Sequence, residues 1–168
     1  MVTIRQFRPG DTDTVHRLFR EGQRDFMGDH FPTEAARKAL DGYIQGALTG
    51  DLADIATAYL DRPNSNFWIA EKGDNPIGCL GIYRHSDAEA EVCRVAVDRD
   101  SRRLGVASQL MDHAESFCRD AGYSRIILRT ASFLTAAISM YQRRGYRLVS
   151  EEGFANTTII ISWYALDL

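Results

Sequence analysis

The sequence is poor in cysteine, and the arrangement of its few cysteines excludes two kinds of site. Its 168 residues contain three, Cys79, Cys93 and Cys118. They are widely spaced, with no CxxC pair and no nearby pair of histidines, which is unlike a disulfide framework or a structural zinc site. The histidines are also scattered, at His16, His30, His85 and His113. We therefore expect no metal centre.

Long apolar runs are missing as well. The longest, around residues 159–161, is far shorter than the roughly 20 residues that span a bilayer. The first residues lack the apolar stretch of a signal peptide. We therefore expect a cytoplasmic protein without membrane attachment.

The sequence has no surplus of positive charge. It holds 20 basic and 23 acidic residues, a formal net charge of −3, whereas nucleic-acid-binding domains carry a basic excess or stripe. Nucleic acid is therefore an unexpected partner. Only Lys38 and Lys72 among the basic residues are lysines.

What is present is the composition of a globular protein. Hydrophobic residues make up 45% of the chain and charged residues 26%, close to the average for folded domains. No repeat, low-complexity tract or linker interrupts the sequence. The length and composition predict a single domain over residues 1–168.

The hydrophobic pattern predicts a mixed α/β (α+β) fold of order βαα(α)βββαβαββ. Helices are expected after Asp11 or Thr12, after a Thr33 N-cap, and over 105–121 and 134–144. Residues 51–60 are expected to form a further helix, because Leu52, Ile55 and Tyr59 would share one face. Strands are expected at 3–7, 67–70, 77–83, 91–97, 125–129, 146–149 and 157–166.

The segment from Val95 to Ser108 has the pattern of an anion site. A strand ends in a polar turn that leads into a helix of small residues, and the first N–H groups of a helix lack intrahelical partners. Gly105 and Ala107 leave room for close approach, and Arg102 and Arg103 add positive charge. The alternative is a tight turn with solvated arginines. The motifs of a P-loop or a dinucleotide fold are absent.

The same segment resembles the GNAT family of N-acetyltransferases. The run from Arg102 to Ala107 fits the family signature Gln/Arg-x-x-Gly-x-Gly/Ala. Further similar segments follow in the family's order at residues 4–11, 67–71 with 77–78, and 137–146. The resemblance covers nearly the whole chain. Within the family, residues 51–68 and 91–98 are most similar to the camello and aspartate N-acetyltransferase subgroup, without the membrane hairpin typical of that subgroup.

The resemblance implies a fold and a co-substrate. In the GNAT fold, a central, mostly antiparallel sheet of about seven strands opens between two parallel strands, and the pantetheine arm of acetyl-CoA enters the gap. The pyrophosphate would lie on the amides from Arg103 to Ser108. The implied acetyl-CoA site comprises Val95, Ala96, Val97, Arg102, Arg103, Leu104, Gly105, Val106, Ala107, Ser108, Leu134 and Tyr141. Leu134 stands where many members have an asparagine, so Ser132 or Thr135 supplies that contact or it is missing.

The resemblance also assigns catalytic roles. Glu91 is at the position of the general base, Tyr141 matches the tyrosine that protonates the departing thiolate, and the Val95 N–H would stabilise the oxyanion. The alternatives are an ion-paired Glu91 with water as the proton acceptor, and a Tyr141 that only packs in the core. Cys93 has no neighbouring histidine, so a buried structural thiol is favoured over an acyl-enzyme nucleophile.

The acceptor is expected to be a primary amine of a small molecule, an amino acid or amine, acetylated directly in a ternary complex. Arg94 and Arg129 are candidates for binding a substrate carboxylate, with a structural ion pair as the alternative for each. A protein lysine or N-terminal acetyltransferase and a non-catalytic acyl-CoA-binding module are the competing functions. A homodimer is possible.

Overall fold

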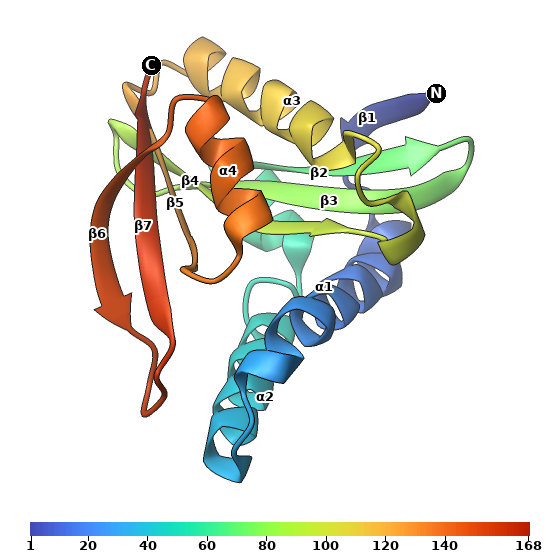
Figure 1. Ribbon diagram of the computed structural model, residues 1–168. Coiled ribbons are helices and arrows are strands. Elements are labelled where there is room, and N and C mark those ends of the chain that lie inside the picture. Colours follow the sequence, from blue (N-terminus) through green and yellow to red (C-terminus); the bar gives the residue numbers. More distant parts are fainter.

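The structure is a computed structural model that describes residues 1–168. The chain folds into a seven-stranded sheet with helices on both faces (Figure 1). The elements follow the chain as β1 (Val2–Gln6), α1 (Thr12–Met27), α2 (Glu34–Thr49), β2 (Asn66–Lys72), β3 (Asn75–Arg84), β4 (Glu89–Val97), α3 (Val106–Asp120), β5 (Arg125–Ala131), α4 (Thr135–Arg143), β6 (Arg147–Gly153) and β7 (Ile160–Asp167). This order confirms the predicted mixed fold.

The sheet is antiparallel except at one place. Its strands lie in the order β1-β2-β3-β4-β5-β7-β6. Strands β1 to β4 form an antiparallel meander, and β5, β7 and β6 are antiparallel to one another. The single parallel pair, β4 with β5, joins these two parts, with α3 as the crossover between its strands.

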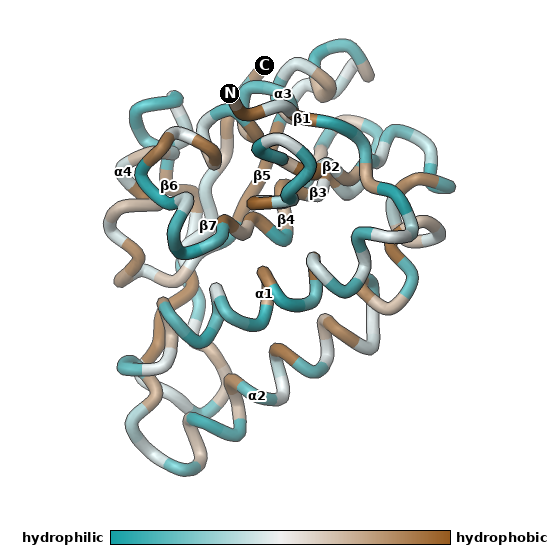
Figure 2. Tube along the Cα trace, turned by 90° about the vertical axis from the view of Figure 1, so that its right-hand side faces the viewer, coloured by the Kyte–Doolittle hydropathy of each residue, from teal (hydrophilic) through white to brown (hydrophobic).

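Each face of the sheet has its own hydrophobic core because strand side chains alternate between the faces. Phe67 and Ile69 of β2 pack with α1 and α2 in one core. Trp68 of β2 and Leu80 of β3 pack with α3 and Tyr141 of α4 in the other. Brown and teal residues recur within the turns of α1 and α2, as expected of helices that bury one side (Figure 2).

Several helix ends lie where the sequence places them. The Thr33 side chain accepts a hydrogen bond from the Ala36 N–H at 3.1 Å, which caps α2, and Gly50 ends that helix. Gly122 has φ +83° after α3, a left-handed conformation that glycine adopts without a side-chain clash. These observations confirm the predicted N-cap of α2 and C-terminal glycine of α3.

The prediction of a further helix over residues 51–60 is wrong for its first half. The Leu52 N–H donates to the Ala47 carbonyl and closes α2. The Asp54 carboxylate then accepts from the N–H and hydroxyl of Thr57 and starts a separate turn, so only Ala56–Leu60 is helical, as one π-helical turn. Leu52, Ile55 and Tyr59 are nevertheless buried; the spacing therefore predicted burial correctly and the backbone incorrectly.

Candidate active site

The sheet opens between its two parallel strands. Strands β4 and β5 pair only over Glu89–Val92 and Arg125–Leu128. Beyond these residues, β4 pairs only with β3 and β5 only with β7. The second half of β4, residues 93–97, therefore has no strand on its β5 side, which confirms the splayed sheet.

The turn from β4 to α3 offers a run of free backbone donors. The N–H groups of residues 103–108 donate to no protein acceptor. Arg103 and Gly105 have φ values of +62° and +77°, so the peptide groups do not follow a regular helix here. Together with the positive end of the α3 dipole, such a row of donors favours an anion.

The two arginines beside these donors differ in their surroundings. Arg102 is already engaged by protein groups: its guanidinium donates to Asp25 at 2.9 Å and to the Val97 carbonyl at 3.2 Å. It also lies over the ring of Phe26, 4.4 Å from the centroid. Arg103 is exposed and makes no ion pair within 4.0 Å. Arg103 is therefore the arginine available to a ligand, and Arg102 instead fastens the turn to α1.

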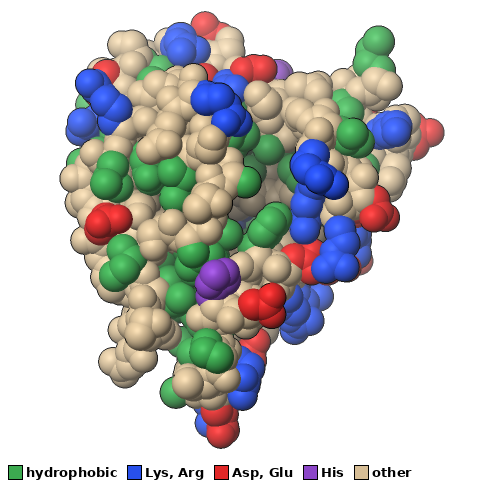
Figure 3. Space-filling view, viewed as in Figure 1, with side chains coloured by type: hydrophobic (Ala, Val, Ile, Leu, Met, Phe, Trp, Pro, Cys, Tyr) green, Lys and Arg blue, Asp and Glu red, His purple; other side chains and the backbone are tan.

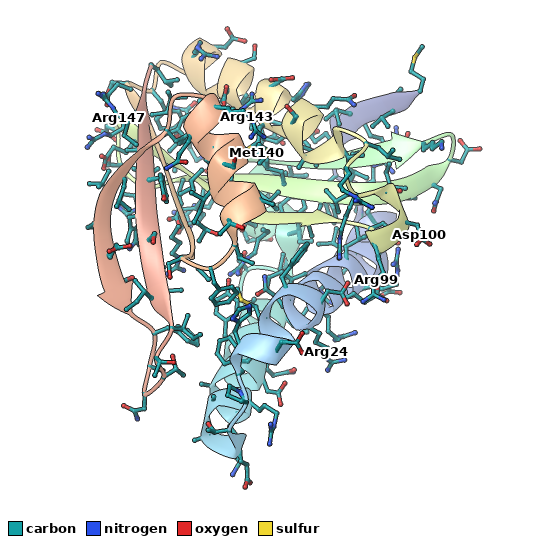
Figure 4. All side chains as sticks on the ribbon, viewed as in Figure 1. Arg24, Arg99, Asp100, Met140, Arg143 and Arg147 are labelled. Carbon is teal, nitrogen blue, oxygen red and sulfur yellow. The ribbon has the colours of Figure 1, made fainter.

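Figure 3 shows a hollow on this face, with hydrophobic side chains on one side and Lys and Arg side chains on the other. In the same view, Met140 of α4 and Arg99 of the β4–α3 turn stand on its two sides (Figure 4). The open edge of β4, residues 93–97, leads along the chain to the free amides of residues 103–108.

Tyr141 lies on α4 beside this opening. Its side chain is buried, and burial raises the pKa of the phenol to about 12. The hydroxyl makes no hydrogen bond to protein. A phenol with this pKa stays protonated at neutral pH, so it is suited to donate a proton rather than to accept one.

The position of α4 is fixed by a buried ion pair. The Arg144 guanidinium, one turn after Tyr141, donates to the Glu115 carboxylate of α3 at 2.8 and 3.1 Å. The Tyr146 hydroxyl donates to the same carboxylate at 3.2 Å. Leu134 precedes α4 as its N-cap residue and offers no side-chain cap.

A pocket of about 320 Å³ lies where β4 and β5 part. Two carboxylates and two guanidinium groups line it, those of Asp51, Glu91, Arg94 and Arg129. The Glu91 side chain is 17% exposed, and Arg129 is 50% exposed with its Nε 3.9 Å from a Glu91 carboxylate oxygen. His85 approaches the other oxygen at 3.8 Å. Glu91 and Arg129 are therefore neighbours in the pocket lining without a close hydrogen bond between them.

The second pair of charges is in direct contact. Arg94 Nε and Nη2 donate to the two Asp51 oxygens at 3.0 and 2.7 Å, and the side chains are 16% and 22% exposed. Burial alone would raise the pKa of Asp51, but hydrogen bonds from Arg94 and the Tyr59 hydroxyl outweigh it and hold this pKa below its ordinary value. Arg94 thus forms a structural ion pair, which was the alternative to its binding a substrate carboxylate.

Sequence reasoning missed Asp51 and the three tyrosines of the pocket, Tyr43, Tyr59 and Tyr83. Asp51 was assigned to a helix, which hid its place at the end of α2. Gly81 of β3 makes room for Tyr59, because a Cβ atom there would lie 2.9 Å from the Tyr59 ring. One signal in the sequence could have indicated that Asp51 lies outside a helix. Gly50 and Asp54 are residues that favour helix ends, and they stand on either side of Asp51.

Cys93 lines the same pocket. Its Sγ lies 3.3 Å from the Tyr59 hydroxyl, and burial raises the pKa of the thiol to about 12. A thiol with this pKa carries little thiolate at neutral pH. This environment is poorly suited to an acyl-enzyme nucleophile.

Two further features bear on the sequence expectations. No helix combines the length and apolar character needed to cross a membrane. No group of three or more His, Cys, Asp or Glu side chains is placed to hold a metal ion.

Comparisons with known proteins agree with the fold and the motif. The Acetyltransferase (GNAT) family matches residues 27–146. Among solved structures, a GNAT acetyltransferase from Staphylococcus aureus superposes with a TM-score of 0.76 at 19% identity, covering 100% of this chain and 99% of the other. The PaiA N-acetyltransferase of Thermoplasma acidophilum, solved with coenzyme A, has a TM-score of 0.76 at 16% identity, covering 97% and 98%.

Curated relatives are similar in sequence. Human N-acetyltransferase 8 is 31% identical over 124 residues, 71% of this chain and 55% of that protein. The rat N-acetylaspartate synthetase is 33% identical over 113 residues, 67% of this chain and 38% of that protein. The chain thus spans about half the length of the first of these relatives and less of the second. The matched family, the fold and these relatives lead to one conclusion: the chain belongs to the GNAT acetyltransferase family.

Proposed function

We propose that residues 1–168 form a single domain that transfers acetyl directly from acetyl-CoA to the primary amine of a small molecule carrying a carboxylate, in a ternary complex. One observation carries this proposal. The open edge of β4 begins at Cys93, two residues after Glu91, and Glu91 lines the pocket that holds Arg129. A donor on that edge and an acceptor in that pocket would therefore meet beside Glu91.

Acetyl-CoA would be held mainly by backbone groups. The pantetheine arm would take the place of a strand along Val95 to Val97, and the pyrophosphate would lie on the N–H groups of residues 103–108. The Val97 carbonyl accepts from Arg102 in this structure, so any hydrogen bond between this carbonyl and the arm would have to replace or share that contact. Arg103 supplies the nearby charge.

The reaction needs a neutral amine, a stabilised oxyanion and a proton for the thiolate. Glu91 would accept the ammonium proton, directly or through a water. The amine then attacks the thioester carbonyl, whose oxygen gains charge beside the Val95 N–H. As the C–S bond breaks, the Tyr141 hydroxyl would donate its proton to the departing sulfur, and the proton that the attacking nitrogen loses as it becomes an amide would restore the phenol.

Arg129 is the better candidate for the acceptor carboxylate. It is half exposed in the pocket, and the Trp163 ring lies 5.5 Å from its guanidinium carbon. An amino acid would bring its ammonium to Glu91 and its carboxylate to Arg129. One relative is named for the synthesis of N-acetylaspartate, the product of acetyl transfer to an amino acid, which supports this class.

The acceptor class is tested by measuring thiol release with pairs of amino acids and their decarboxylated amines. Arg129→Gln is expected to raise KM for the amino acid by roughly 10- to 100-fold, the value of a charge-assisted hydrogen bond, and to change KM for the amine little. The matched control is Arg125→Gln on the same strand, because Arg125 pairs with Glu89 and Asp167 outside the pocket.

Equal changes for acid and amine would contradict the role of Arg129. Transfer to peptide N-termini or lysines, with none to amino acids or amines, would favour the protein acetyltransferase. Absence of transfer to any amine, with acetyl-CoA bound, would favour the non-catalytic module.

Glu91 is tested by the pH profile of kcat/KM. Glu91→Gln is expected to reduce activity most near neutral pH and to recover partly at high pH, where the free amine forms without a base. The control is Glu89→Gln, two residues earlier on β4 and paired with Arg125. If Glu91→Gln scales the whole profile by one factor and leaves its acidic limb unmoved, water rather than Glu91 accepts the proton.

A further inference from the structure

Strand β4 carries an irregularity beside the proposed reaction centre. Cys93 pairs with Gly81 and Ala96 pairs with Cys79, so two residues of β4, Arg94 and Val95, face a single residue of β3. Arg94 has φ +55°, a left-handed conformation that a residue with a long side chain rarely adopts. Such a bulge changes the direction in which the following peptide groups point.

A strained residue persists only when its surroundings hold it, and the Arg94 side chain is held on every side. Two of its nitrogens donate to Asp51 at 2.7 and 3.0 Å. The third, Nη1, donates to the Tyr43 hydroxyl at 3.3 Å. The guanidinium carbon lies 5.3 Å from the centre of the Phe19 ring.

Asp51 is itself fixed. Its Oδ2 accepts from the Tyr59 hydroxyl as well as from Arg94. Tyr59 is almost fully buried against Phe67, with ring centres 5.0 Å apart. The carboxylate therefore ties the loop after α2 to the bulge of β4, a link between residues 43 positions apart in the sequence.

We infer that Asp51 is a positioning residue: by gripping Arg94 it holds the bulge of β4, and with it the peptide group of Val95 that is to bind the thioester carbonyl. This inference rests on the proposed function. It also gives Arg94 a different role from carboxylate binding, because its nitrogens are already engaged.

The test uses Asp51→Asn, which keeps the side-chain size and one acceptor oxygen but removes the charge. The expected result is a fall in kcat of about 10- to 100-fold, less than the loss of an oxyanion donor outright. KM for acetyl-CoA and for both the amino acid and its decarboxylated amine should change little. Arg94→Lys, which keeps the charge but not the two-point contact, should lower kcat in the same way.

A second readout reports the hydrogen bond itself. Acetyl-CoA is labelled with ¹³C at the thioester carbonyl and bound in the absence of the acceptor. Its infrared carbonyl stretch should lie at lower frequency when bound to the wild-type protein than in water. In Asp51→Asn this shift should shrink, and Asp51→Glu should restore part of it. A merely structural role would lower the melting temperature without moving the carbonyl frequency of the bound fraction.

The combined variant Asp51→Asn/Arg94→Lys should be about as impaired as the worse single variant, because the two residues act as one unit. Should Asp51→Asn not fold, Arg94→Lys decides by the same measurements. An unchanged carbonyl shift, or a raised KM for carboxylate acceptors alone with kcat intact, would overturn the inference. If the protein without any substitution transfers no acetyl group, the proposed function itself is overturned.

Discussion

Replacement of Tyr141 with phenylalanine is expected to lower kcat by about 10²- to 10⁴-fold, the range for loss of a proton donor. The exchange removes only a hydroxyl that bonds to no other protein group, so the fold and the affinity for acetyl-CoA should persist. The pKa of about 12 means that the phenol is protonated at neutral pH. The loss should therefore be one constant factor across about pH 6 to 9.

The control for Tyr141→Phe is Tyr164→Phe. Tyr164 is buried in the same core but on β7, so this variant should keep its activity. Calorimetry gives the affinity for acetyl-CoA, and thiol release at saturating substrate gives kcat. Full activity of Tyr141→Phe would return Tyr141 to a packing role.

Gly105→Glu is expected to abolish binding of acetyl-CoA, because a carboxylate would stand at the amides that are to hold the pyrophosphate. A side chain there has space, since the nearest atom to a Cβ is 4.0 Å away. The φ of +77° makes any side chain strained, however. Backbone strain alone should only weaken the binding of acetyl-CoA. The added negative charge should abolish it.

Gly105→Gln separates these two effects, because it has the same bulk and the same backbone strain without the charge. We expect a several-fold loss of affinity for Gly105→Gln and a further loss of at least about tenfold for Gly105→Glu, the effect of one charged contact. Thermal unfolding without ligand should be alike for the two variants. Equal affinities would show that the charge at this position is immaterial and that the pyrophosphate lies elsewhere.

The sequence predicted those parts of the fold that depend on local pattern. Alternating residues predicted β2 and β3, and the Thr33 cap and Gly122 predicted helix ends because each acts within a few residues of the chain. The family motif placed Gly105 at the start of α3. The open edge of β4 was expected from the resemblance alone, since nothing in the local pattern of β4 distinguishes Glu91 from Val95.

The parts that could not be predicted depend on contacts between distant segments. Arg94 meets Asp51, 43 positions away, only because the loop after α2 folds back onto β4, and Arg102 meets Asp25 of α1 across 77 positions. A list of charged residues does not say which arginine is paired. Arg94 and Arg129 were therefore equal candidates until the structure showed one engaged and the other half exposed.

The short contact between β4 and β5 has a consequence for the mechanics of the molecule. Only four residue pairs form the parallel ladder between the two parts of the sheet. A ligand lying along residues 93–97 would act as an eighth strand and bridge them, so its binding would also stabilise the folded state. At 100 times its dissociation constant such a ligand adds about 2.7 kcal/mol to the free energy of unfolding. The abundance of the intact protein would then follow the supply of its acyl donor.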